Sequence, residues 1–158
     1  MSHSLIAGFV ASFASLLGPT APQAPEAYLT RLEFKQLNWL VGTWRGSGLS
    51  VPERFEQYAV RDDSTLVMRE YADSTFQVVT DSATIEWRNN AVKSRSAKAT
   101  YVVIAFSASA VRFMRPGAWG GGHTYRLISG DEWTATLHPE KRRGKATIYT
   151  MRRVRRDD

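Results

Sequence analysis

From Gly42 onward, apolar and polar residues alternate with a period of two, and no long stretch shows the spacing of a helix. Short runs rich in Val, Ile, Thr, Tyr, Phe and Trp are separated by Asp, Asn, Gly, Ser or Pro, which is typical of strands joined by turns. Such short connections place consecutive strands side by side and antiparallel. After a first strand that begins at Gly42, we expect strands at 53–60, 65–71, 75–80, 81–88, 91–98, 100–107, 110–115, 123–128, 132–137 and 145–154.

This pattern predicts an all-β fold for residues 28–158. About eight to ten strands in one domain form either a sandwich or an antiparallel up-and-down β-barrel. We favour the barrel because closure removes exposed strand edges. The chain has 158 residues, which is enough for one domain with a sizeable core.

A short helix is expected just before the first strand. Four leucines between residues 29 and 40 lie near helical spacing. Thr30 is a suitable N-cap with Glu33 three residues later, and Gly42 ends the pattern.

Residues 1–27 are expected to be a secretory signal segment followed by an extended, proline-spaced linker. Their apolar run is shorter than the roughly 20 residues that a membrane-spanning helix needs, so no transmembrane span is expected. The alternative is an N-terminal helix that packs on the domain. We therefore expect an exported protein, periplasmic or secreted, with a cytoplasmic location as the alternative.

The stretch LNWLVGTWRGSG (37–48) leads from the expected helix into Gly42-x-Trp44 at the start of the first strand. This arrangement resembles the calycin group of lipocalin-like barrels and, within it, nitrobindin-like and related uncharacterised bacterial lipocalin-like domains. The resemblance implies a barrel that Trp44 closes at one end, with an arginine near the last strand stacked over its indole ring. Arg152 and Arg153 are the candidates, and their opposite strand parity allows at most one of them to reach Trp44.

No cofactor or metal is expected. Nitrobindins carry a haem-ligating histidine near the C-terminus, whereas the last expected strand of this chain contains none. The chain has no cysteine, so it can form neither a disulfide nor a thiolate metal site. His123 and His138 each lack a second ligand at i+2 or i+4.

The first long hairpin decides which side chains should face the interior. With RDDS (61–64) as its connection, Tyr58 is expected opposite Val67, and Glu56 opposite Arg69 as an outer ion pair. The more apolar face is expected to line the interior. That face carries Phe55, Gln57, Ala59, Leu66, Met68 and Glu70.

We expect a ligand to contact Gln57, Met68, Glu70, Trp87 and Tyr125. Inside a mainly apolar lumen, Gln57 and Glu70 would need water, an arginine or a ligand as partner, and a wet rim is the alternative position. Trp87 and Tyr125 each offer an apolar body with one hydrogen-bonding tip. The loop RPGAWGGGH (115–123) is expected to connect two strands, or to place Trp119 over the mouth as a lid.

These features favour a non-enzymatic barrel that binds a small, partly apolar molecule in its lumen, and no catalytic residue is assigned. One alternative is a barrel enzyme or isomerase that uses a lumen carboxylate or His123 as general base. Another is a polyanion-binding module that uses the basic C-terminal strand, since the net charge is +6. A nucleic-acid partner is not expected, because basic clusters commonly serve solubility. A lumen filled by its own side chains also remains open, as do ligand identity and oligomeric state.

Overall fold

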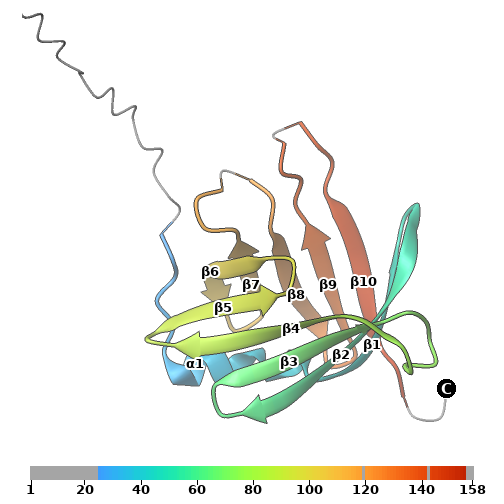
Figure 1. Ribbon diagram of the computed structural model, residues 1–158, viewed down its shortest axis with the longest axis horizontal. Coiled ribbons are helices and arrows are strands. Elements are labelled where there is room, and N and C mark those ends of the chain that lie inside the picture. Colours follow the sequence, from blue (N-terminus) through green and yellow to red (C-terminus); the bar gives the residue numbers. More distant parts are fainter. Residues whose placement is uncertain (1–24, 119, 142, 156–158) are drawn as a thin grey trace, which may run out of the picture.

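The structure is a computed structural model that describes residues 25–118, 120–141 and 143–155. Its strands form a closed barrel in which each strand pairs antiparallel with its sequence neighbours and the last strand pairs with the first (Figure 1). The predicted all-β barrel is therefore confirmed, with ten strands. The strands are β1 (Gly42–Gly48), β2 (Val51–Asp62), β3 (Thr65–Tyr71), β4 (Val79–Arg88), β5 (Ala91–Ser96), β6 (Thr100–Ser107), β7 (Ala110–Met114), β8 (His123–Ser129), β9 (Glu132–Leu137) and β10 (Thr147–Arg153).

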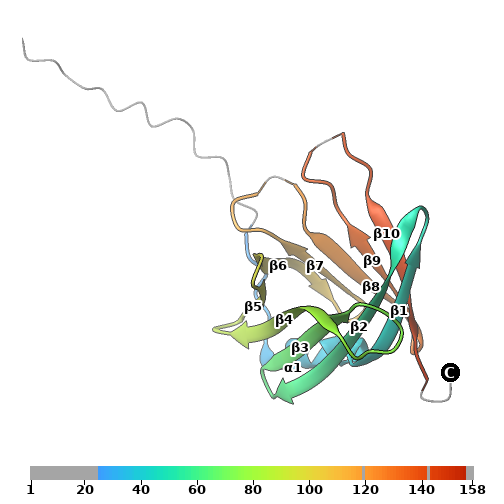
Figure 2. The same ribbon diagram turned by 45° about the vertical axis from the view of Figure 1, so that its right-hand side comes forward.

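The expected helix is present in two parts, α1 (Arg31–Lys35) and the 3-10 helix η1 (Gln36–Leu40). The predicted capping box is confirmed, because the Thr30 hydroxyl accepts from the Glu33 amide at 3.3 Å and the Glu33 carboxylate accepts from the Thr30 amide at 2.7 Å. The helical segment covers one end of the barrel, and the long β7–β8 and β9–β10 loops lie at the other (Figures 1 and 2).

A short extended segment before the helix closes a gap in the wall. β5 and β6 pair over only three residues, Lys93 to Arg95 on β5. Beyond this point, the Ala27 amide donates to the Val103 carbonyl and the Leu29 amide to the Asn90 carbonyl, both at 2.8 Å. Residues 1–24 of the expected signal segment and linker lie outside the described residues. Among the described residues, no helix has the length and apolar character needed to cross a membrane.

The expectation of a separate strand at 75–80 is wrong. Residues 72–78 form a loop, and β4 begins at Val79. Within this loop Phe76 has a φ of 54°, and its ring meets Phe55 and Tyr71 edge to face at centroid distances of 5.9 and 5.3 Å. Packing of this aromatic group on the outer wall therefore overrides the local alternation.

The predicted register of the β2–β3 hairpin is also wrong by one residue. The turn has only two residues, 63–64, and a bulge between Val60 and Asp62 puts Tyr58 opposite Met68. The Asp62 carboxylate fixes the turn by accepting from the Ser64 amide and hydroxyl, each at 2.9 Å. Because side chains alternate along a strand, this one-residue shift exchanges the inner and outer faces of β2.

Candidate ligand-binding site

The end of the barrel beneath the helix is closed by Trp44, which is completely buried. Its indole N–H donates to the Leu40 carbonyl at 2.7 Å. The Arg153 guanidinium lies 4.2 Å from the centroid of the indole ring and donates to the Val41 carbonyl at 3.1 Å. The predicted arginine over Trp44 is therefore Arg153. Arg152 points outward and pairs with Glu132 at 3.1 Å.

Gly42 is needed at this closed end. Its φ is 142°, and a Cβ atom at this position would collide with the Arg153 side chain. The glycine of the Gly42-x-Trp44 motif therefore lets the arginine lie flat on the tryptophan.

Aromatic rings fill the interior next to Trp44. Trp133 is fully buried and meets Trp44, Trp39 and Tyr58 edge to face at centroid distances of 5.9, 6.0 and 6.0 Å. Tyr125 lies against the same ring at 4.8 Å. This half of the lumen is occupied by the protein's own side chains.

The other half of the lumen holds a cavity of about 320 Å³ that opens away from α1. Its volume is at the small end of the range for ligand pockets, about 300–1,000 Å³. Its walls combine aromatic, apolar, hydroxyl and charged side chains: Arg54, Met68, Glu70, Asp81, Ala83, Ser94, Ser96, Lys98, Ala99, Tyr101, Arg115, His123, Tyr125 and Leu137.

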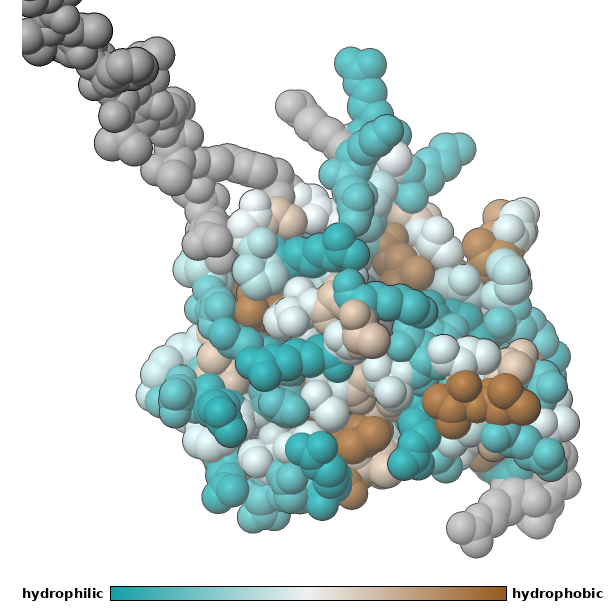
Figure 3. All heavy atoms as spheres, in the orientation of Figure 1, coloured by the Kyte–Doolittle hydropathy of each residue, from teal (hydrophilic) through white to brown (hydrophobic). Residues whose placement is uncertain are grey.

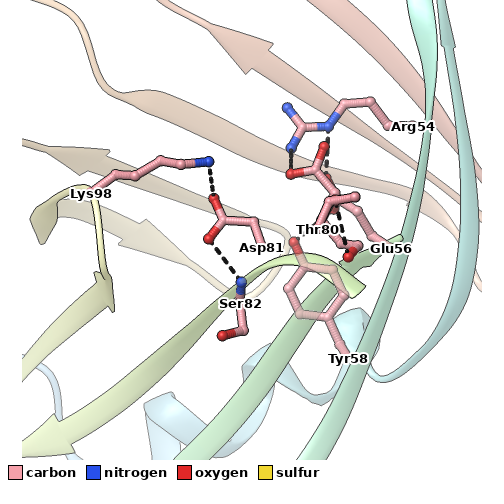
Figure 4. Close-up of polar contacts among 8 residues, drawn as sticks. Arg54, Glu56, Tyr58, Thr80, Asp81, Ser82 and Lys98 are labelled. Atoms are coloured by element: carbon pink, nitrogen blue, oxygen red, sulfur yellow. Dashed lines mark hydrogen bonds and ion pairs between the residues drawn. The ribbon is translucent and has the colours of Figure 1, made fainter. Parts of the chain in front are cut away.

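A buried charged group lies at the inner end of this cavity (Figure 4). The Arg54 guanidinium bridges two carboxylates, with Nε 2.9 Å from Glu56 and Nη2 3.0 Å from Glu70. The Tyr58 hydroxyl donates to the second oxygen of Glu56 at 2.9 Å. The bulge in β2 creates this group, because it turns Arg54, Glu56 and Tyr58 inward toward Glu70 on β3.

Burial shifts the titration of these groups. Loss of solvent raises the pKa of Glu56, and the Arg54 charge and the Tyr58 hydrogen bond only partly oppose that rise. Burial and the adjacent Glu56 carboxylate raise the pKa of Tyr58. The pKa of Arg54 is also raised, because its two carboxylate partners outweigh its own loss of solvent. Arg54 therefore stays charged, whereas Glu56 takes up a proton more readily than an exposed glutamate.

His123 forms part of one aromatic wall of the cavity. Its ring stacks on Phe113 at 4.7 Å and lies 4.9 Å from Tyr101 and 4.8 Å from Tyr125. Burial and the positive charge of Arg54 lower the pKa of His123 to about 3. The imidazole is therefore neutral at pH 7 and can both donate and accept a hydrogen bond.

Two ion pairs border the mouth. Lys98, in the β5–β6 connection, contacts Asp81 of β4 at 2.8 Å (Figure 4). Arg115 lies 3.4 Å from Glu140 and 5.6 Å from the centroid of the Tyr101 ring. The first pair joins the β5–β6 connection to β4, and the second joins the β7–β8 and β9–β10 connections. Hydrophilic side chains project from the upper part of the surface in Figure 3.

Three of the five predicted ligand contacts line the cavity, namely Met68, Glu70 and Tyr125. Gln57 does not, because the shifted register turns it outward, where its side-chain oxygen accepts from the Tyr71 hydroxyl at 3.1 Å. Trp87 shares the inner face as expected, but it belongs to the closed end and donates to the Leu29 carbonyl at 2.8 Å.

The predicted outer ion pair between Glu56 and Arg69 is also wrong. The one-residue register shift that turns Gln57 outward turns Glu56 into the lumen. The missed lumen residues Arg54, Glu56 and Tyr58 all lie on β2. Asp62 is the signal that could have predicted this register, because aspartate often caps a tight turn. A turn capped by Asp62 contains only the next two residues, and that turn places Arg54, Glu56 and Tyr58 on the inner face.

The expected loop at 115–123 is a connection that ends where β8 begins, at His123. The Gly121 amide donates to the Pro139 carbonyl, and the His138 amide to the Gly122 carbonyl, each at 2.9 Å. Trp119, the residue of the expected lid, lies outside the described residues. Among the residues that are described, no group of three or more metal-ligating side chains occurs.

The fold and the site define a closed ten-stranded antiparallel barrel with one filled end and one open end, which is compatible with a lipocalin-like (calycin) fold. No protein-family model matches the chain, and a search of curated proteins gives no match either. The site geometry is therefore the basis for the function proposed below.

Proposed function

We propose that this protein binds a small, partly apolar molecule in the open half of its barrel. The observation that carries the proposal is the cavity of about 320 Å³ between the aromatic plug and the mouth. Apolar and aromatic walls favour a ligand body at about 25 cal/mol per Å² of buried apolar surface, before ordering costs. Glu70, Tyr125 and His123 supply polar groups that orient it.

The experiment is native mass spectrometry of protein purified from its own source, with two matched variants on β4. Ala83 is buried and lines the cavity, whereas the adjacent Ser82 is exposed on the outer face. We expect a co-purified small molecule on the wild-type protein and on S82F, and its loss from A83F. Circular dichroism establishes that both variants are folded.

Two outcomes would contradict lumen binding. The first is a bound molecule that A83F retains as fully as the wild-type protein. The second is a wild-type protein that carries no molecule and whose unfolding temperature is not raised by any member of a panel of small apolar compounds.

The resemblance of 37–48 to nitrobindin-like domains extends to the plug of Trp44 and Arg153, and we propose a distant relationship to that group. We do not extend the haem chemistry of the group to this chain, because β10 contains no histidine. Its inward residues include Tyr149 and the fully buried Met151, whose sulfur packs against Gly46.

Catalysis by His123 or a lumen carboxylate is the second candidate function. The raised pKa of Glu56 favours it, since general acids often lie in such surroundings. Two features oppose it: Glu56 already bonds Arg54 and Tyr58, and the pKa of about 3 makes His123 a weak base. Binding is therefore the function that the geometry supports better.

Polyanion binding by the C-terminal strand has less support. Arg152 pairs with Glu132, Arg155 pairs with Asp131 at 2.9 Å, and Arg153 covers Trp44. These described arginines thus already have partners within the fold. Nucleic-acid binding with a steep salt dependence would support polyanion binding, and absence of binding at low salt would rule it out.

We also propose export, on the apolar run and proline-spaced linker of residues 1–27. The test is the N-terminal sequence of the protein isolated from its source. Cleavage within or just after this segment is expected, and an intact N-terminus on cytoplasmic protein would contradict export.

A further inference from the structure

The charged group in the lumen has more carboxylates than cations. One guanidinium, Arg54, serves both Glu56 and Glu70. His123 adds no charge, because its pKa is about 3. With both carboxylates ionised, the lumen has one uncompensated negative charge, which is costly to bury.

Glu70 is the carboxylate that a ligand can reach. The Glu56 side chain is 6% exposed, and both of its oxygens have partners, Arg54 and Tyr58. The Glu70 side chain is 27% exposed and lines the cavity. A carboxylate has about four acceptor sites, so the single bond from Arg54 to Glu70 leaves capacity for a ligand.

The rest of the cavity suits a cation with an apolar body. Tyr101, Tyr125 and the neutral His123 ring supply aromatic walls, and aromatic faces attract ammonium groups. Ser94 lies on the cavity wall with 9% exposure. Its hydroxyl is a second polar group that a ligand can contact.

An anionic ligand fits less well. Arg54 already directs Nε and Nη2 at carboxylates, and its guanidinium lies 5.5 Å from the centroid of the Tyr149 ring. At the mouth, Lys98 and Arg115 have their own partners in Asp81 and Glu140. An anion would have to displace one of these carboxylates.

Resting on the proposed lumen binding, we propose that the ligand is a small aromatic or aliphatic amine whose protonated nitrogen bonds Glu70 and whose body lies against Tyr101 and Tyr125. The ammonium group supplies the positive charge that the lumen lacks when both carboxylates are ionised. Its donors pair with the Glu70 carboxylate and the Ser94 hydroxyl.

The test uses three probes with the same ring and different charge: phenethylamine, 2-phenylethanol and phenylacetate. Isothermal titration calorimetry measures their affinity for the full chain at pH 7. A charge-assisted hydrogen bond predicts that phenethylamine binds about tenfold or more tightly than 2-phenylethanol. Phenylacetate is expected to bind most weakly.

A matched pair of variants assigns this preference to one residue. E70Q leaves Arg54 paired with Glu56 alone and should remove the preference for phenethylamine over 2-phenylethanol. E53Q makes the same chemical change on the outer face of β2, where Glu53 pairs with Arg45, and should keep the wild-type preference.

The outcomes separate the two proposals. A wild-type protein that binds 2-phenylethanol or phenylacetate as tightly as phenethylamine would overturn the amine assignment while retaining lumen binding. A preference that survives in folded E70Q would also overturn it. Absence of binding by all three probes would overturn the assignment and count against lumen binding itself. If E70Q does not fold, the relative affinities of the three probes for the wild-type protein test the amine assignment by themselves.

Discussion

The two halves of the lumen are built from different chemistry. At the closed end, the rings of Trp44 and Trp133 pack together beneath the helical segment, and the Arg153 guanidinium lies over the Trp44 ring. In the open half, a charged group around Arg54 is set among tyrosines and hydroxyls and borders a cavity.

Under the proposed function, this difference separates stability from ligand recognition. The closed end buries apolar surface, and backbone carbonyls accept from the indole N–H groups of Trp44 and Trp87, so it stabilises the fold. The open half leaves the polar groups Glu70 and Ser94 facing a cavity. Changes at the closed end should therefore lower the free energy of unfolding irrespective of pH. Changes among the charged groups of the open half should lower it in a pH-dependent way and should also alter binding.

The largest effect is expected at the plug. W44A removes a completely buried indole and should lower the free energy of unfolding by about 4 kcal/mol. Y101A, on the open wall, should lower it by about 1 kcal/mol. Urea denaturation measures the free energy of unfolding of both variants. Equal decreases in W44A and Y101A would contradict the distinction between the two halves.

R54M should cost about 3 kcal/mol at pH 7, because it leaves the buried Glu56 and the partly exposed Glu70 without their cation. Removing Arg54 raises the pKa of Glu56 further above its unfolded value. Stability from a group with a raised folded pKa is present below its unfolded pKa and is lost as pH rises through the folded pKa.

The deficit of R54M relative to the wild-type protein should therefore shrink between pH 7 and about pH 4. Urea denaturation at both pH values measures it. A deficit that is constant or grows on acidification would show that Glu56 is not the buried charge responsible.

The two adjacent arginines of β10 provide an internal control for the closed end. R153M removes the cation over Trp44 together with the hydrogen bond to Val41 and should cost about 2 kcal/mol. R152M removes only an exposed pair with Glu132 and should cost about 0.5 kcal/mol or less. Equal thermal unfolding shifts in the two variants would contradict the stacked arrangement.

The smallest effect is expected from Q57L, on the outer face of β2. It breaks one partly exposed hydrogen bond with Tyr71 and should change the free energy of unfolding by at most about 0.5 kcal/mol. Probe affinity should match the wild-type value, in contrast to E70Q on the inner face of β3. Loss of probe binding in Q57L would contradict the assigned faces of β2 and β3.

Local sequence signals predicted the features that depend on short-range chemistry. The capping box of Thr30 and Glu33, and strand boundaries such as those of β3 and β9, agree with the structure. Alternation was misleading where long-range packing competes with it, as at Phe76, whose ring is held by Phe55 and Tyr71.

The candidate site was predicted only in part, for a similar reason. Met68, Glu70 and Tyr125 were placed correctly because β3 and β8 follow simple alternation. Gln57 and Glu56 were exchanged because one residue at the β2–β3 connection decides which face of β2 is inner.

The sequence by itself indicated a meander of about eight to ten strands preceded by a capped helix, and its resemblance to lipocalin-like barrels restricted the partner of Trp44 to two arginines. Only the tertiary structure decided that Arg153 is that partner and that Arg54, Glu56 and Tyr58 face the lumen. The physical reason is that local preferences specify turns and strands, whereas strand register is fixed by the contacts that form when the barrel closes. A single bulged residue then exchanges every side chain between core and solvent.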